Sequence, residues 1–371
     1  MNGIDVPFIH LLLLIAGSAT GMSYFLCRVM RLISPRLGYI DHPGGRKSHA
    51  KPMPLGGGVA IMLTMIVLIV GGLVAVLGGS YRSVSGFDWF KIHEAGFALR
   101  AHQAGGVLLC ALILHVLGLF DDIKNFGPWM KLTVQFAAAG LVVVGFDVRV
   151  GLFLPVPAIA ALVSILWIVV ITNAFNFLDN ADGLASGAAL ICTLVLLVIA
   201  ATAGQIFVSG YLVCLAGALF GFLLHNFPPA RLYLGDAGSL PVGFLLGVGS
   251  ILTTYYHEQD PSQAKASAFI PLVVMAVPLY DFLSVVLLRW LSGVSPLAGD
   301  HRHFSHRLLR RGLTVRQTVL TIYLACSGTA AAAIILRKVA WPYAVLLFGQ
   351  TVCIVAIIAL LEYQPGNDRK T

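Results

Sequence analysis

Charge is what this sequence has least of. Only 11% of its 371 residues are Asp, Glu, Lys or Arg, whereas 58% are hydrophobic. A soluble domain carries about 25% charged residues, so this composition excludes a water-soluble globule. It also excludes a disordered chain, a coiled coil and a collagen. The sequence therefore predicts an integral membrane protein, and the question becomes what its few polar residues do.

Cysteine is scarce as well. The six cysteines are widely spaced in apolar stretches, and no CxxC occurs, which argues against a disulfide scaffold and against a zinc site. The formal net charge is +8, yet the sequence has no run of like charges and no basic stretch interleaved with aromatics. We therefore expect no nucleic-acid partner. The basic excess instead favours cytoplasmic loops that face anionic lipid head groups.

Long apolar stretches are abundant. A helix needs about 20 predominantly apolar residues to cross a bilayer, and a scan at that length predicts about eleven spans, with ten as the alternative. The candidate spans are 6–31, 55–79, 104–120, 132–147, 152–172, 184–203, 207–225, 239–255, 267–290, 317–335 and 341–361. We predict an all-α, polytopic helical bundle in which residues 1–371 form one domain, with a short cytoplasmic tail at 362–371.

The basic residues fall mostly on one side of these spans. The loops after the first, third, fifth, seventh and ninth spans, together with the C-terminal tail and adjoining helix ends, hold 17 of the 24 Lys and Arg. The positive-inside rule places this set in the cytoplasm and the N-terminus outside. We therefore expect a multi-pass protein of the inner (plasma) membrane.

Acidic residues gather in the same cytoplasmic loops, although charge sorting alone would leave mostly Lys and Arg there. Carboxylates near a bilayer are costly unless they bind a cation or a partner, so these loops form the candidate functional site. The loops span 41–58, 118–135, 173–187, 225–243 and 295–312, and their acids include Asp41, Asp121, Asp122, Asp179, Asp182, Asp236 and Asp300.

The second loop begins with two adjacent aspartates. Asp121 and Asp122 follow an apolar span directly, and neighbouring carboxylates repel each other unless a cation is near. The pair suits a general base, a metal ligand or both, while a hydrated helix end is the alternative interpretation. Lys131, further along the same loop, suits phosphate binding.

The third loop repeats polar residues at a three-residue spacing. Asn173, Asn176, Asp179 and Asp182 would form one continuous stripe if the helix ran through all four. Two amides and two acids make a poor lipid-facing surface, so we expect the stripe to line a polar cavity. A hydrogen-bonded seam between helices is the alternative.

The fourth loop contains LGDAGS, in which Asp236 stands between two glycines just before an apolar span. A carboxylate at a helix N-terminus with glycines beside it suits Mg²⁺ held over a diphosphate. An ordinary loop turn is the alternative. No GxxxxGK is present, so this is not a P-loop.

The fifth loop is rich in histidine, with the sequence HRHFSH at 301–306. No cysteine supports zinc binding, and the interleaved Arg302 and Arg307 favour phosphate; a basic patch beside the membrane is the alternative. Asp281 lies within the preceding span, where a carboxylate is either functional or paired with a neighbouring helix.

As an ordered set, these five loops resemble the polyprenyl-phosphate N-acetylhexosamine-1-phosphate transferase family over roughly residues 35–310, and within it the undecaprenyl-phosphate GlcNAc-1-phosphate transferase branch. The resemblance implies an enzyme that moves a sugar-1-phosphate, most simply GlcNAc-1-phosphate, from a UDP-sugar to undecaprenyl phosphate for cell-envelope polysaccharide synthesis. It also implies Mg²⁺ as the cofactor, with Mn²⁺ as the alternative, and a homodimer is compatible with it. The competing readings are another UDP-N-acetyl sugar, including UDP-MurNAc-pentapeptide, and an ion-coupled transporter.

The resemblance also assigns roles by position. Its implied metal ligand is Asp236, and Asp182 would sit at the nucleotide base. This sequence departs from the family pattern at Asn180, where Gly is usual, and at Ser305, where the middle His is usual. Implied catalytic residues are Asp121, Asp122, Lys131, His303 and His306, and implied substrate-binding residues are Lys47, His49, Asn173, Asn176, Asp179, Asp182, Asn226, Tyr233, Arg302 and Arg307.

Overall fold

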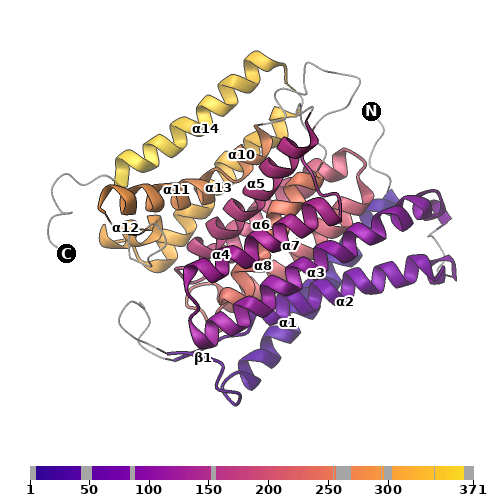
Figure 1. Cartoon of the computed structure of the whole chain (residues 1–371), viewed down its shortest axis with the longest axis horizontal. Helices are drawn as coiled ribbons and strands as arrows, with labels where there is room; N and C mark the ends of the chain where they lie inside the picture. The colour runs from indigo at the N-terminus through magenta and orange to yellow at the C-terminus, as the bar shows by residue number, and fades with distance from the viewer. Residues whose placement is uncertain are drawn as a thin grey trace.

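The structure is a computed structural model that describes residues 6–42, 52–83, 88–151, 156–253, 255, 269–293, 295, 303–337 and 339–362. Within these ranges the chain is a bundle of long helices with a single two-stranded hairpin (Figure 1). Three predicted substrate-binding residues, Lys47, His49 and Arg302, lie outside the described residues, as does the predicted tail from residue 363 onward.

The elements follow one another along the chain as α1 (Val6–Ile33), β1 (Ile40–Asp41), β2 (Met53–Pro54), α2 (Gly57–Leu77), the 3₁₀ turns η1 (Ser80–Ser83) and η2 (Asp88–His93), α3 (Glu94–Lys124), α4 (Pro128–Gly140), the π turn η3 (Leu141–Gly145), α5 (Pro157–Leu178), α6 (Leu184–Thr202), α7 (Ile206–Asn226), α8 (Asp236–Leu252), α10 (Ile270–Val274), α11 (Ala276–Leu291), α12 (Phe304–Arg310), α13 (Val315–Leu336) and α14 (Trp341–Glu362).

Each predicted span contains a helix, which confirms the all-α polytopic class. Among the described residues, nine helices are long and apolar enough to cross a membrane. The segment predicted at 239–255 is α8, a shorter apolar helix of 17 residues. The segment predicted at 267–290 is divided at Met275 into α10 and α11. The number of crossings and the orientation therefore stay predictions.

Two prolines explain local features of these shorter helices, because proline has no backbone N–H to donate to the carbonyl four residues earlier. Pro278 leaves the Val274 carbonyl free, and Cys192 Sγ donates to it at 3.3 Å. Pro241 lies inside α8 and leaves the Ala237 carbonyl free. The buried His115 ring supplies the replacement, with Nδ1 2.6 Å from that oxygen. Both helices therefore take from a neighbour the hydrogen bond that their proline removes.

The N-terminus of α8 is held between two other helices by direct backbone contact. A Cβ atom at Gly58 of α2 would lie 2.3 Å from the Gly238 nitrogen, and a Cβ atom at Gly118 of α3 would lie 2.3 Å from the Asp236 oxygen. Gly58 therefore serves the tight packing of α2 against α8. This packing fixes Asp236 beside the end of α3.

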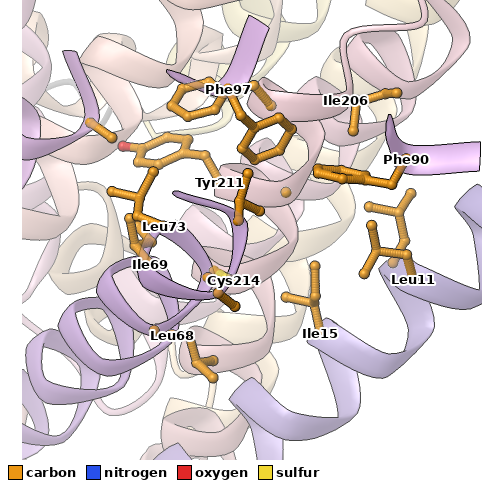
Figure 2. A pocket seen from close by; sticks show the side chains of 18 of the residues that line it. Leu11, Ile15, Leu68, Ile69, Leu73, Phe90, Phe97, Ile206, Tyr211 and Cys214 are labelled. Carbon is orange, nitrogen blue, oxygen red and sulfur yellow. The ribbon is translucent and has the colours of Figure 1, made fainter. Parts of the chain in front are cut away.

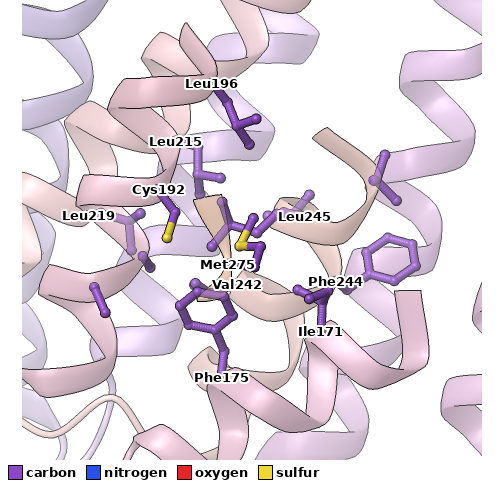
Figure 3. Packing of buried hydrophobic residues seen from close by; sticks show 14 of the residues in the cluster. Ile171, Phe175, Cys192, Leu196, Leu215, Leu219, Val242, Phe244, Leu245 and Met275 are labelled. Atoms are coloured by element: carbon purple, nitrogen blue, oxygen red, sulfur yellow. The ribbon is translucent and has the colours of Figure 1, made fainter. Parts of the chain in front are cut away.

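The interior of the bundle is an apolar core. Phe175 and Ile171 of α5 pack with Val242 and Phe244 of α8, and all four side chains are buried (Figure 3). The α5 helix is thereby fixed against α8 just before it reaches the polar loops. Helix α14 lies at one edge of the bundle, far from α1 and α2 (Figure 1).

Candidate active site

One lysine joins two carboxylates from different helices. Lys131, in the second turn of α4, places Nζ 2.9 Å from Asp236 Oδ2 and 3.0 Å from Asp121 Oδ2. Asn176, from the last turn of α5, donates from Nδ2 to the other Asp236 oxygen at 2.9 Å. The structure thus brings together four predicted site residues that are as much as 115 positions apart in the sequence.

This cluster is open on one side. The Lys131 and Asp236 side chains keep 23% and 25% of their surface exposed, whereas Asp121 keeps 9%. Asp121 is further fixed because its Oδ1 accepts from the Phe126 backbone N–H at 2.7 Å. Lys131 and Asp236 are therefore the more accessible members of the cluster.

Asp122 has a different role from Asp121. Its Oδ1 accepts from the Asp236 N–H at 2.7 Å, and its Oδ2 accepts from the Ala237 N–H at 3.3 Å and from the Tyr39 hydroxyl at 2.5 Å. A carboxylate against a helix N-terminus satisfies the free N–H groups and complements the helix dipole. Asp122 therefore caps α8 from another helix. Gly235 makes room for it, because its φ is +71° and a Cβ there would lie 2.6 Å from Asp122 Oδ2.

Sequence reasoning missed Tyr39. Burial, followed by the nearby Asp122 charge, raises the pKa of its phenol above the usual range, so the hydroxyl stays protonated and donates to Asp122. Tyr39 precedes the strand β1 in the first loop, and its contact with Asp122 bridges 83 positions. Nothing in the local sequence pattern marks it.

The predicted stripe in the third loop is wrong as a single helical face. Helix α5 ends at Leu178 and Asp179 is its cap, so only Asn173 and Asn176 lie on the helix. Asn173 donates to Gln135 Oε1 at 2.5 Å and to the Val169 carbonyl at 2.8 Å, which makes it part of a seam between α5 and α4. The turn that follows leads to Gly183 (φ +73°), the N-cap of α6.

The two aspartates of this loop lie beyond the helix, close to the rest of the site. Burial raises the pKa of Asp179 well above its ordinary value, and the charges of Asp236, Asp122 and Asp182 add to the effect. Asp182 Oδ2 accepts from the Ala230 N–H at 2.9 Å, so it ties the third loop to the fourth. Carboxylates that raise one another's pKa in this way are an arrangement that a bound cation would relieve.

Asn226 is an internal brace. Its Oδ1 accepts from the Gly183 N–H and the Ser186 hydroxyl, both at 3.0 Å, and its Nδ2 donates to the Leu232 carbonyl at 2.9 Å. Only 3% of Asn226 is exposed. In the structure, Asn226 holds the third and fourth loops together. Its predicted role in substrate binding stays a prediction.

Tyr233 lies beside the acids of the third loop. Burial raises the pKa of its phenol, and the charges of Asp182 and Asp179 raise it further. Its backbone joins the fourth loop to the first, because its N–H donates to the Pro54 carbonyl and its carbonyl accepts from the Gly57 N–H, each at 3.0 Å. Tyr233, one of the predicted substrate-binding residues, is therefore set at the junction of three loops.

The fifth loop is anchored by the intramembrane carboxylate. Asp281 Oδ2 lies 3.0 Å from His303 Nδ1, and its Oδ1 accepts from the Phe304 N–H at 2.6 Å. Asp281 is fully buried and caps α12, so it is paired with the fifth loop, and a functional role through His303 stays a prediction. The His303 ring packs edge-on against the Phe177 ring, with 5.7 Å between the centroids. Phe177 directly follows Asn176, so the fifth loop lies beside the end of α5.

The other described residues of the fifth loop extend from this anchor. The rings of His303 and His306 are 6.3 Å apart between centroids. The Arg307 guanidinium donates to Ser284 Oγ at 2.9 Å and lies over the Tyr280 ring. Two histidines and an arginine therefore form a basic group that α11 holds in place.

The metal prediction can be tested against the donor set. No group of three or more His, Cys, Asp or Glu in the described ranges has an arrangement suited to holding a metal ion. The donors nevertheless fit a hard cation, because Asp236 and Asp121 supply carboxylate oxygens. Burial and the neighbouring carboxylates raise the pKa of Asp179, and a cation bound nearby would lower it again. These oxygen donors are of the type that Mg²⁺ prefers, and a metal at Asp236 stays a prediction.

The fold and site together define a class: a polytopic membrane protein with a lysine-bridged carboxylate cluster where several helices end. Comparison with known proteins narrows this class. The model of glycosyl transferase family 4 matches residues 104–254, which contain the whole cluster. The chain belongs to this family, which confirms the resemblance drawn from its loops.

Three relatives illustrate the similarity. The chain is 30% identical over 319 residues to the probable undecaprenyl-phosphate N-acetylglucosaminyl 1-phosphate transferase of Bacillus subtilis, covering 84% of this chain and 80% of that protein. It is 31% identical over 348 residues to the decaprenyl-phosphate N-acetylglucosaminephosphotransferase of Mycolicibacterium smegmatis, covering 87% and 81%. It is 25% identical over 319 residues to the undecaprenyl-phosphate alpha-N-acetylglucosaminyl 1-phosphate transferase of Escherichia coli, covering 80% and 76%.

Proposed function

We propose that this protein transfers GlcNAc-1-phosphate from UDP-GlcNAc to a polyprenyl phosphate, most simply undecaprenyl phosphate, at the cytoplasmic face of the inner (plasma) membrane. The observation that carries the proposal is the Asp121–Lys131–Asp236 cluster at the ends of three helices. The names of relatives that cover most of the chain support the substrates. The placement of basic loops on one side supports the orientation.

In this reaction an oxygen of the lipid phosphate attacks the β-phosphorus of UDP-GlcNAc. A new phosphorus–oxygen bond forms there, the bond from that phosphorus to the bridging oxygen breaks, and UMP leaves with the electron pair. Both reactants are anions, so catalysis depends on positioning and on charge stabilisation. Lys131 can move from its carboxylate partners to phosphate oxygens, and Arg307, beside His303 and His306, adds positive charge.

The two aspartates of the second loop have separate roles in this scheme. Asp121 lies next to Lys131 and orients it, because its Oδ2 is 3.0 Å from Nζ. Asp122 keeps α8 in place and thereby holds Asp236 at the cluster. Mg²⁺, or Mn²⁺ with its similar preference for oxygen ligands, would be held by Asp236 with Asp121 beside it and would neutralise the diphosphate when bound.

The direct test is a release assay. Purified protein with Mg²⁺, UDP-GlcNAc and undecaprenyl phosphate should release UMP and form a lipid-diphosphate sugar, as measured by mass spectrometry. A panel of UDP-sugars that includes UDP-MurNAc-pentapeptide identifies the donor. No UMP from any donor would overturn the proposal. The same preparation, examined by light scattering, tests the predicted homodimer.

A further inference from the structure

A cavity lies away from the carboxylate cluster, toward the other end of α3. It has a volume of about 400 Å³ and is enclosed by α1, α2, α3 and α7, which is within the roughly 300–1,000 Å³ of ligand sites. Its lining on α3 includes Val107, which is 14 residues before Asp121 and so about 21 Å away along the helix. Leu68 and Ile15 lie at one end of this cavity and Phe90 at the other (Figure 2).

The lining of the cavity is suited to hydrocarbon. Its three buried polar side chains all have partners within the protein. Tyr211 donates to the Leu245 carbonyl at 2.6 Å, Tyr81 donates to Glu94 at 2.8 Å, and Gln103 donates to two backbone carbonyls at 3.3 Å. These groups are not available to orient a polar ligand, so the occupant is recognised by apolar contact alone.

The cavity has one closed end and one open side. At the closed end, Tyr81 packs on Phe90 at 5.3 Å and Phe90 packs on Phe97 at 4.8 Å between ring centroids. At the side, Leu14 of α1 is 62% exposed, and a Cβ atom at Gly72 of α2 would meet nothing within 4 Å. Hydrocarbon can therefore enter from the bilayer between α1 and α2.

We propose that this cavity binds the far end of the acceptor's polyprenyl tail, an inference that rests on the proposed function. The closed aromatic end faces the outer surface in the predicted orientation, so a chain whose phosphate lies at the cytoplasmic site would arrive tail first. A tail of about ten isoprene units has about 40 backbone bonds of about 1.5 Å each, which covers the distance from Asp121 with units to spare. An ordinary phospholipid anchored at the cytoplasmic surface has a much shorter chain.

Filling the cavity tests the proposal. Gly72→Phe and Gly210→Phe place a ring in open space from two different helices, because a Cβ at either position has no neighbour within 4 Å. We expect each variant to lose about tenfold in kcat/KM for undecaprenyl phosphate, as removal of a few buried hydrocarbon groups implies. The kcat/KM for farnesyl phosphate, which is too short to reach the cavity, should not change.

The matched control is Gly328→Phe on α13, an exposed glycine that also has open space around its Cβ position. It should leave both acceptors unaffected. Folded variants that keep the wild-type ratio of the two kcat/KM values would overturn the proposal. A second result would also overturn it: the Gly72→Phe variant loses a bound phospholipid but keeps the wild-type ratio of the two kcat/KM values. The cavity would then hold a bilayer lipid.

A measurement on the wild-type protein covers the case in which both variants fail to fold. Undecaprenyl phosphate with a photoreactive group at its far end should label peptides of α1, α2, α3 or α7, which enclose the cavity, and labelling confined to other helices would overturn the proposal. Failure of the proposed function looks different, because the wild-type protein would then release no UMP with either acceptor.

Discussion

The Ser305 hydroxyl donates a hydrogen bond to the Asn180 side-chain oxygen and thereby joins two loops that are 125 positions apart. These are the two positions at which the sequence departs from the family pattern. Asn180 also donates from Nδ2 to the Phe177 carbonyl at 2.7 Å, at the end of α5, and Ser305 is buried in the first turn of α12. The pair therefore links the turn that carries Asp179 to the helix that carries His306.

The link predicts energetic coupling between the two positions. Asn180→Gly and Ser305→Ala should each lower kcat/KM for the UDP-sugar by about three- to tenfold, and the double variant should lose no more than the worse single variant, because contacting residues couple by roughly 0.5–3 kcal/mol. A double-mutant cycle on steady-state rates measures this. Losses that simply multiply would show that the two residues act separately.

Replacement of Lys131 tests the centre of the cluster. Lys131→Met removes the cation between Asp121 and Asp236, so two carboxylates are left facing each other and no ammonium meets the phosphates. We expect kcat to fall by about 10²–10³-fold, as when a preorganised electrostatic group is removed. The matched control is Lys124→Met, an exposed lysine at the end of α3, which should keep near-wild-type UMP release. Equal losses in the two variants would count against the cluster.

Asp122 should behave as a cap in a stability measurement. Asp122→Ala leaves the Asp236 and Ala237 N–H groups without their acceptor, which should cost about 0.5–2 kcal/mol as for other helix caps, and activity should fall with it because Asp236 moves. Thermal unfolding in detergent reports the first effect and UMP release the second. Tyr39→Phe should give a smaller change in the same direction. Lost activity with an unchanged melting temperature would instead point to a direct chemical role for Asp122.

Removal of divalent cations tests the proposed metal. UMP release should stop in EDTA and return when Mg²⁺ or Mn²⁺ is added in excess, because Asp236 and Asp121 offer oxygen ligands within a net negative group. Asp236→Asn should raise the Mg²⁺ concentration needed for half-maximal rate, since one ligand charge is lost. Activity that survives complete chelation would rule out the metal role.

The helices were predictable because length and apolarity are properties of a single stretch of chain. The break at Met275 and the shortness of α8 were not predicted. Nor were the contacts by which carbonyls freed by prolines find partners on other helices, as the Ala237 carbonyl does at His115. The order of the polar loops was enough to place Asp121, Lys131 and Asp236 in one site, because loops that follow alternate spans emerge on the same side of a membrane.

The separate roles of the individual site residues could not be predicted from the sequence. The three-residue spacing from Asn173 to Asp182 predicted one face, but the helix ends at Leu178 and the amides and acids separate. Asp121 and Asp122 are equivalent in the sequence, and only the arrival of α8 against Asp122 makes one a cap and the other a partner of Lys131. Tyr39 could not be found, because its contact depends entirely on tertiary folding.

The backbone contacts of Gly58 and Gly118 with the first turn of α8 restrict how this enzyme can diversify. A single methyl group at either glycine would displace Asp236 without touching a charged atom. Substitutions at these two positions are therefore poorly tolerated. The connecting segments that hold Asn180, Asp182 and Tyr233 are only half-buried, so their length and composition can change while the buried packing stays the same.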